Sequence, residues 1–246
     1  GNLMFKKIMK AFLITFFSLF FFAACVRTPS THSPSTSTSS VESTSSTDNT
    51  VTLDGKWEAI EFRNTIERSL GYIDMADSHA SRLIYSDAMK DVAPTLTISE
   101  DQVSFEYRLE MKPLIDNYYA YKEKDPKEPI TISKEEFTTN LLNNFKGIFD
   151  KYKHHKVELD RDKLTAHSVL KDGMLNETDK TIFFLETPNI LGLAIVGGAD
   201  VRYPVFYHYE LIGNILTLTL ETKSATEDEF PMYFEMKFKK VAEDSK

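Results

Sequence analysis

The sequence is poor in the residues and patterns that mark reactive sites. Its 246 residues include one cysteine, Cys25, one tryptophan, Trp57, and only nine glycines and nine prolines. It contains no HExxH metal-binding pattern, no nucleophile elbow and no phosphate-binding loop. The lone thiol has no partner in the chain, although thiols of exported proteins usually pair. These absences predict a protein that is not an enzyme and that holds neither a metal ion nor a cofactor.

The chain also lacks an excess of positive charge. It carries 29 basic and 37 acidic side chains, for a formal net charge of −8. Three lysines and no acid lie in residues 1–24, so the remainder has 26 bases against 37 acids, or −11. A surface this acidic repels phosphate backbones and anionic lipid. Nucleic acid is therefore not an expected partner.

The long hydrophobic run is confined to the N-terminus. Lys6, Lys7 and Lys10 precede an apolar run over 11–22, which has the length of a signal peptide rather than of a membrane span. We interpret residues 1–24 as a signal peptide.

The signal peptide ends in Phe22-Ala23-Ala24, directly before Cys25. Small residues before a lone cysteine resemble the bacterial lipobox. This resemblance implies cleavage before Cys25 and a membrane anchor through a diacylglyceryl group on its sulfur. The alternative is an ordinary secretory signal followed by an unmodified thiol.

Residues 25–50 have the composition of a tether. Sixteen of the 23 residues from Thr28 to Thr50 are Ser or Thr, and almost none are apolar. Such a segment cannot bury enough surface to offset its ordering entropy, so we expect it to be disordered. A flexible chain of this length spans roughly 25–30 Å on average. The prediction is a head anchored to the outer face of a Gram-positive cell membrane and exposed through the cell wall.

The remaining residues, 51–242, are predicted to form one mainly β domain. Gly55 and Trp57 begin an alternating run in which Trp57, Ala59 or Ile60, and Phe62 enter a core as one strand. Later strands are expected at 95–98, 102–110, 163–170, 180–186 and 205–221, the last being a hairpin around Gly213-Asn214, followed by a closing strand with Phe234, Met236 and Phe238 inward. Lys171-Asp172-Gly173 is interpreted as a turn.

Two insertions interrupt the strands. The first, at about 64–93, shows three- and four-residue apolar spacing that predicts two short helices. The second, at about 112–154, has a loop near Pro126 and Pro129 and then a helix that begins with a capping box, Ser133 to Glu136.

The Gly55-x-Trp57 start and the run Tyr207-x-Tyr209-x-Leu211-x-Gly213-Asn214 resemble bacterial lipocalin-like lipoproteins of the calycin type. The resemblance implies an antiparallel up-and-down barrel with two helical insertions, α+β overall. It also implies a tryptophan at the barrel base covered by a basic residue of the last strand, where Lys239 or Lys240 falls. Closure of the barrel is physically reasonable because it leaves no exposed sheet edge.

The candidate contact residues are mostly tyrosines, which combine large contact area with small entropic cost. They either pack the barrel or face outward to bind a partner. His154 and His155 with Asp160, or His167 with Asp172, could supply metal ligands, but we do not expect a metal site because their spacing matches no recognised site. The candidate binding residues are Tyr118, Tyr119, Tyr121, Tyr203, Tyr207, His208 and Tyr209.

Two functions remain open. The first is a monomeric surface module that binds host or extracellular-matrix macromolecules, as an adhesin does. The second is a carrier that holds a small hydrophobic or amphiphilic ligand inside the barrel. The inward Phe and Leu residues fill a barrel well, which favours the first.

Overall fold

The structure, a computed structural model, describes the part of the chain that follows the predicted tether. The predicted signal peptide, Cys25, the predicted tether and Tyr203 lie outside the described residues. The described residues are 51–71, 78–186, 188–190, 193–194, 204–222 and 232–243.

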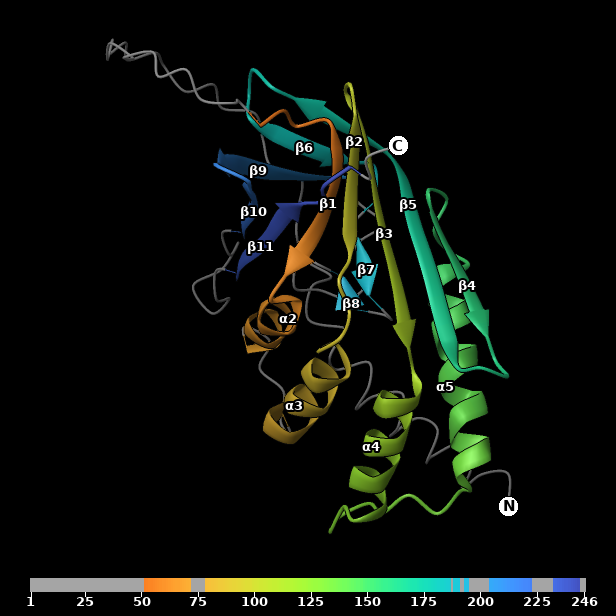
Figure 1. Cartoon of the computed structure of the whole chain (residues 1–246). Helices are drawn as coiled ribbons and strands as arrows, with labels where there is room; N and C mark the ends of the chain where they lie inside the picture. Colours follow the sequence, from red (N-terminus) through yellow and green to blue (C-terminus); the bar gives the residue numbers. More distant parts are fainter. Residues whose placement is uncertain are drawn as a thin grey trace.

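Eight strands of the described residues close into a ring (Figure 1). Each pairs antiparallel with the next strand of the ring along the chain, and the last pairs with the first, Trp57 lying opposite Lys240. This is the predicted up-and-down, calycin-like barrel. The strands of the ring are β1 (Gly55–Ile60), β2 (Thr95–Ser99), β3 (Gln102–Glu110), β5 (Thr165–Asn176), β6 (Thr181–Phe184), β9 (Val205–Ile212), β10 (Ile215–Thr222) and β11 (Met232–Lys240).

Three short strands lie outside this ring. β4 (His155–Asp160) pairs with β5 alongside the β3–β5 closure. β7 (Asn189–Ile190) and β8 (Leu193–Ala194) form a separate antiparallel pair.

Both predicted helical insertions are present. α2 (Phe62–Gly71) and α3 (Ser78–Ala88) form the first, and α4 (Lys112–Glu123) and α5 (Lys134–Phe149) form the second. Figure 1 shows α2, α3 and α4 beyond the end of the barrel at which β1 and β3 finish, while α5 runs beside β4 and β5. The helices therefore gather at one end of the barrel and along one side.

The start of α5 follows the predicted capping box. The Ser133 hydroxyl accepts a hydrogen bond from the Glu136 backbone N–H at 3.1 Å. The helix α4 was not predicted in its own right. Its buried residues recur at helical spacing, and Pro113 lies in its first turn, where a missing N–H costs nothing. These buried residues are Leu114, Ile115, Tyr118 and Lys122.

Two local predictions were wrong. Phe62 does not extend the first strand, because Glu61 adopts a positive φ of 53° that ends β1 and lets α2 begin. Phe62 is nevertheless buried. Lys171-Asp172-Gly173 is not a turn either, since β5 continues through it to Asn176.

The Lys171–Gly173 segment is a bulge in β5. The pairing with β3 shifts register between Val103 and Phe105, and Asp172 takes a φ of 66° to accommodate the extra residue. A Cβ on Gly173 would lie 2.6 Å from the Phe184 ring, so only glycine fits under that ring.

The inward side chains of the described residues fill the space that they enclose. Alternate strand residues point inward, as the sequence pattern predicts. If these residues lined an internal cavity wide enough for water, their side chains would have surface exposed to that cavity. Twelve inward side chains are no more than 1% exposed: Trp57, Leu96, Ile98, Phe105, Tyr107, Leu170, Ile182, Phe184, Tyr207, Leu216, Leu218 and Phe238.

Candidate functional site

The end of the barrel away from α2, α3 and α4 is organised around Trp57. Its indole Nε1 donates to the Leu53 carbonyl at 2.8 Å, and the Lys240 Nζ lies 5.4 Å from the centre of the ring. The same ammonium donates to the backbone carbonyls of Thr52 and Asp54. Lys240 rather than Lys239 covers the indole, because Lys239 lies opposite Glu58 on the exposed side of β11.

Gly55 makes this arrangement possible. Its φ is +127°, a conformation that side chains rarely adopt, and a Cβ there would lie 3.0 Å from the Lys240 Cε. The spacing of Gly55 and Trp57 therefore places the indole inside and lets the lysine stem pass over it. We name these residues, with Lys240, the barrel base.

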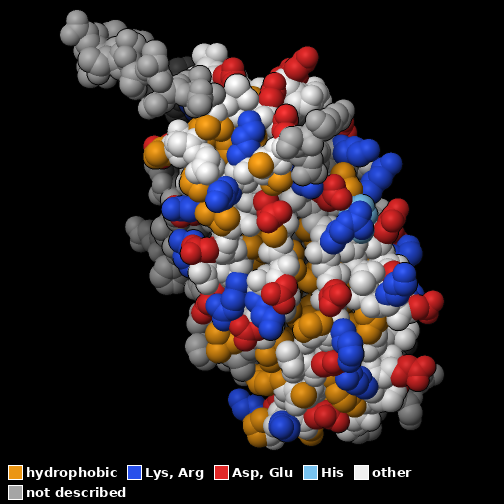
Figure 2. Space-filling model, viewed as in Figure 1, with side chains coloured by type: hydrophobic (Ala, Val, Ile, Leu, Met, Phe, Trp, Pro, Cys, Tyr) orange, Lys and Arg blue, Asp and Glu red, His pale blue; other side chains and the backbone are white. Residues whose placement is uncertain are grey.

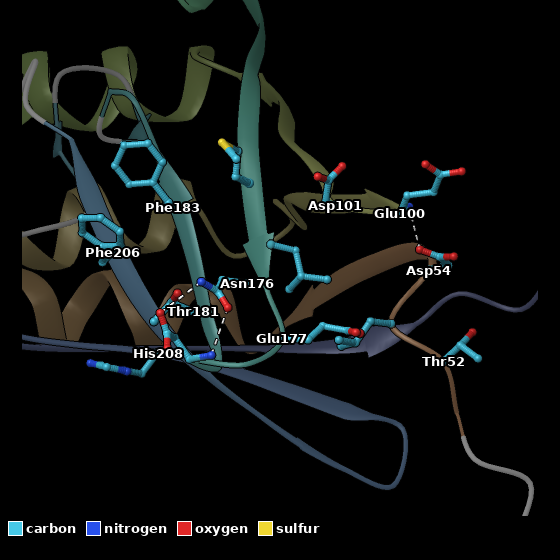
Figure 3. Close-up of a pocket in the computed structure, with 14 residues that line it drawn as sticks. Thr52, Asp54, Glu100, Asp101, Asn176, Glu177, Thr181, Phe183, Phe206 and His208 are labelled. Carbon is cyan, nitrogen blue, oxygen red and sulfur yellow. Dashed lines mark hydrogen bonds between the residues drawn. The ribbon is translucent and has the colours of Figure 1, made fainter. Parts of the chain in front are cut away.

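An open groove of about 880 Å³ lies beside the barrel base. The segment before β1, the β2–β3 turn and the β5–β6 turn form its rim, and β5, β6 and β9 contribute side chains. Figure 3 shows Phe183 and Phe206 on one side and Asp54, Glu100 and Asp101 on the other. The lining residues include Thr52, Asp54, Glu100, Asp101, Met174, Asn176, Glu177, Asp179, Thr181, Phe183, Phe206 and His208.

An apolar row crosses the outer face of the barrel wall in this groove. Met174 on β5 pairs with Phe183 on β6, and Phe183 pairs with Phe206 on β9. The two phenyl rings lie 4.6 Å apart between centroids. Met174 is 50% exposed and Phe206 is 57% exposed. We call Met174, Phe183 and Phe206 the apolar row.

The apolar row includes half of the large hydrophobic side chains that are exposed among the described residues. Within the described residues, four large hydrophobic side chains are exposed, and Met174 and Phe206 are two of them. A third, Leu185, lies two residues after Phe183, just past the end of β6. The fourth, Ile212, lies at the tip of the β9–β10 hairpin. Clustered exposed apolar residues mark interaction surfaces more often than isolated ones do.

The charged residues of the groove all have one sign. Five acids line it, and none of the described residues that line it is Lys or Arg. Asp54 is fixed, because its Oδ1 accepts from the Glu100 N–H at 2.9 Å. Asp179 is fixed by reciprocal hydrogen bonds with Asn176. Within the described part of the chain, the carboxylates of Glu100 and Glu177 form no hydrogen bond or ion pair.

A second groove provides a contrast. It has a similar volume, about 940 Å³, but its lining mixes the acids Asp91 and Glu110 with the bases Lys90 and Arg108. Acidic and basic side chains are likewise interspersed over the face seen in Figure 2. The single sign of charge in the first groove is therefore a local property.

Most of the predicted contact tyrosines are packing residues. Tyr207 and Tyr209 are the inward residues of β9, and burial raises the pKa of each phenol above its usual value. Tyr118 is buried and stacks on Phe137 of α5. These three side chains are therefore unavailable for an outward contact. Of the predicted β9 residues, His208 alone faces outward and lines the groove.

The other two tyrosines of α4 are half-buried. The Tyr119 hydroxyl donates to the Ile132 carbonyl at 2.8 Å, which ties α4 to the loop before α5. Tyr121 lies 5.9 Å from the Lys122 ammonium. The tyrosine cluster predicted from the sequence therefore joins the second helical insertion together.

The histidines do not converge on a metal site. His154 pairs with Asp172 at 2.9 Å, and His167 pairs with Glu106 at 2.7 Å. Asp160 instead accepts from backbone N–H groups of its own turn. Across the described ranges, no group of three or more His, Cys, Asp or Glu side chains could hold a metal ion.

His155, the first residue of β4, is buried against the C-terminal end of α5. Its ring lies edge-on to Phe149 and Tyr152, its Nε2 contacts the Ser168 hydroxyl, and burial lowers its pKa to about 4. A serine beside a histidine is a potential catalytic pair, but Ser168 has no exposed surface. A substrate cannot reach that hydroxyl, so the pair serves packing.

Apart from His208, the groove residues were not among the predicted site residues, for an identifiable reason. Alternation along 205–212 does place Phe206 opposite to the inward Tyr207, which would have marked Phe206 as exposed. Met174 could not be assigned, because the segment before it was interpreted as a turn that ended the strand. The partnership of Met174, Phe183 and Phe206 depends on two strand pairings, Met174 with Phe183 and Phe183 with Phe206, and the second joins segments separated by β7 and β8.

The fold and the groove define the protein as a closed antiparallel barrel with an acidic and apolar outer groove. Searches of protein-family models, curated proteins and solved structures found no match for this chain. No helix in the described ranges is long and apolar enough to cross a bilayer. Function is therefore inferred from the geometry and the surface chemistry.

Proposed function

We propose that this protein is a non-catalytic, lipid-anchored surface protein related to the lipocalin-like lipoproteins. Its barrel is a binding module for a host or extracellular-matrix macromolecule. The observation that carries the proposal is the contrast between a filled barrel interior and an exposed apolar row on the outer wall. Because the apolar row lies on the outer face of the barrel, a ligand that covers it must itself present a large surface, as a macromolecule does.

The filled interior supports outward binding over internal carriage. A carrier barrel must leave a cavity at its centre to enclose a small ligand. Here inward residues of three different strands, Leu96 of β2, Ile182 of β6 and Leu216 of β10, have no exposed surface. A small molecule would have to displace those side chains to enter.

The N-terminal sequence supports display at a cell surface. A signal peptide, a lipobox-like Phe22-Ala23-Ala24-Cys25 and a Ser/Thr-rich tether precede the barrel in the order that an anchored head requires. To test the anchor, cells expressing the chain are fed a clickable fatty acid. We expect label on the wild-type chain and on a Ser30→Ala control, and none on Cys25→Ala, which is released into the medium. Membrane retention of Cys25→Ala would refute the anchor.

The binding role is tested with intact cells and with purified chain. Cells that display the chain should adhere to at least one immobilised matrix protein, and cells with an empty vector should not. Native mass spectrometry of the full chain, purified in mild detergent, should give a mass without a bound small molecule. A stoichiometric co-purified ligand together with no adhesion would favour the carrier instead.

A further inference from the structure

We propose that the groove beside the barrel base binds an extended, basic segment of a partner polypeptide whose apolar side chains cover the apolar row. This inference rests on the proposed function and specifies the chemistry of the partner. The occupant is defined by three properties of the groove: its apolar floor, its single sign of charge and its length.

The apolar floor requires an apolar partner. Phe206 is 57% exposed and Met174 is 50% exposed. Both lie on the outer face of an antiparallel sheet, and the solvent-facing side of such a sheet is normally polar. Covering such side chains removes apolar surface from water, which favours binding in proportion to the area covered. Aromatic and methionine side chains are enriched in protein interfaces for this reason.

The charge of the groove selects a basic partner. Glu100 and Glu177 carry carboxylates that have no hydrogen bond or ion pair with described residues, and Asp101 adds a third near them. Two nearby lysines interact with other groups than these carboxylates. Lys240 donates to backbone carbonyls at the barrel base, and the Lys180 ammonium lies over the Tyr209 ring. A cationic segment would therefore be attracted to the groove, and an acidic segment would be repelled.

The length of the apolar row suits an extended chain. Met174, Phe183 and Phe206 occupy three neighbouring strands, so the row crosses two strand spacings, or about 10 Å. An extended peptide covers that distance in about three residues. A segment with apolar residues a few positions apart and Lys or Arg around them matches both the row and its acidic rim.

The competing explanation is that Phe183 and Phe206 only stabilise the sheet. Cross-strand aromatic pairs do so in antiparallel sheets. That explanation accounts for the 4.6 Å ring contact, but not for the five acids of one sign or for the exposure of Met174 and Leu185. The two explanations differ in whether Phe206 affects peptide binding.

The test measures binding of labelled peptides to the full chain, purified in non-ionic detergent, by fluorescence anisotropy. The first peptide is a twelve-residue chain of Lys, Phe and Gly. In the second peptide Glu replaces every Lys, and in the third Ser replaces every Phe. We expect the first to bind, with an affinity that falls as salt is added, and we expect both of the others to bind at least about tenfold more weakly.

Variants locate the binding site. Phe206→Ser should weaken the first peptide by about tenfold, and Glu177→Gln should weaken it by about two- to threefold at low salt. Two matched controls should leave it within about twofold: Ile212→Ser, which removes an exposed hydrophobe at the hairpin tip, and Glu110→Gln, which removes an acid from the second groove. If Phe206→Ser does not fold, Met174→Ser tests the same row.

Each outcome decides the matter. Equal binding of the basic and acidic peptides would overturn the charge assignment, and unchanged binding in Phe206→Ser and Met174→Ser would overturn the apolar row as the site. Cells that still adhere to matrix protein while those two variants adhere equally well would reject the groove but leave the proposed function standing. Loss of adhesion in the folded variants, with adhesion kept in Ile212→Ser, would support both.

Discussion

The inner and outer faces of β6 and β9 are made from alternating residues of the same short segments, yet they differ in what explains them. Ile182, Phe184 and Tyr207 point inward and are almost fully buried. The need to form a hydrophobic core is sufficient to explain why these residues are apolar or aromatic. Phe183 and Phe206 point outward, where a sheet that faces water normally carries polar residues. Burial in the core cannot explain the outward pair. The difference separates residues that are explained by stability from residues that need a functional explanation.

The largest effect is expected at the barrel base, on the inner side. Trp57→Ala should lower the free energy of unfolding by about 3–5 kcal/mol, because a fully buried aromatic side chain leaves a cavity. Trp57→Phe should cost less, since it keeps a ring but loses the hydrogen bond to the Leu53 carbonyl. Urea titration measures both losses. A loss below about 1 kcal/mol for Trp57→Ala would contradict its place at the base.

The next effect depends on pH and lies in the buried layer beneath α5. His155 has a pKa of about 4 in the folded chain and 6.5 when unfolded, so the unfolded chain binds more protons between these values. Stability due to His155 is therefore complete above about pH 6.5 and is lost as the pH falls, by about 3 kcal/mol at pH 4.

His155→Gln isolates this contribution from the titration of carboxylates. Urea titrations of both proteins at pH 7 and pH 4 should show a smaller loss in the variant by about 3 kcal/mol. Parallel losses in the two proteins would mean that His155 is protonated in the folded state.

A smaller effect is expected at the bulge of β5. Gly173→Ala should destabilise the chain by about 1–3 kcal/mol, because the new methyl group meets the Phe184 ring and the Val103 carbonyl. Gly147→Ala is the matched control, since nothing lies within 4 Å of a Cβ at that helical position. Thermal unfolding should show a lower midpoint for Gly173→Ala and an unchanged or higher one for Gly147→Ala. Equal midpoints would remove the packing reason for glycine at 173.

The smallest effect on stability is expected on the outer face. Phe206→Ser should cost less than about 1 kcal/mol, the size of a cross-strand aromatic pair, while it abolishes most peptide binding. A loss as large as that of Trp57→Ala would erase the distinction between the two faces. Chemical denaturation of the variant, alongside the peptide titration, separates the two roles.

The sequence predicted the barrel better than the site. The alternation along 102–110 and 205–212 and the Gly213-Asn214 turn correctly placed the strands, because each of these signals is local. Gly213 has a φ of +60° and Asn214 has no positive φ, which makes the turn type II′.

The groove could not be predicted from the sequence, because its lining depends on how separate segments pair in the sheet. The Asp172 bulge resembled a turn, so β5 was ended too early, and Met174 was lost with it. Without the length of β5, nothing in the sequence aligns Met174 with Phe183. Nor does the sequence place around them the acids of two separate turns and of the segment before β1. The tyrosines drew attention for their type, but Tyr118 and Tyr207 pack the interior.

The contacts of Lys240 and Trp57 at the barrel base have a mechanical consequence under the proposed anchoring. A force applied at Val51 would first act on the three residues that follow it. The carbonyls of Thr52 and Asp54 accept hydrogen bonds from Lys240, and the carbonyl of Leu53 accepts one from Trp57. Lys240 ends β11, so a pull on the first strand is shared at once with the last. A force applied through the proposed tether would therefore act on β1 and β11 together, and their pairing would resist separation of the two strands.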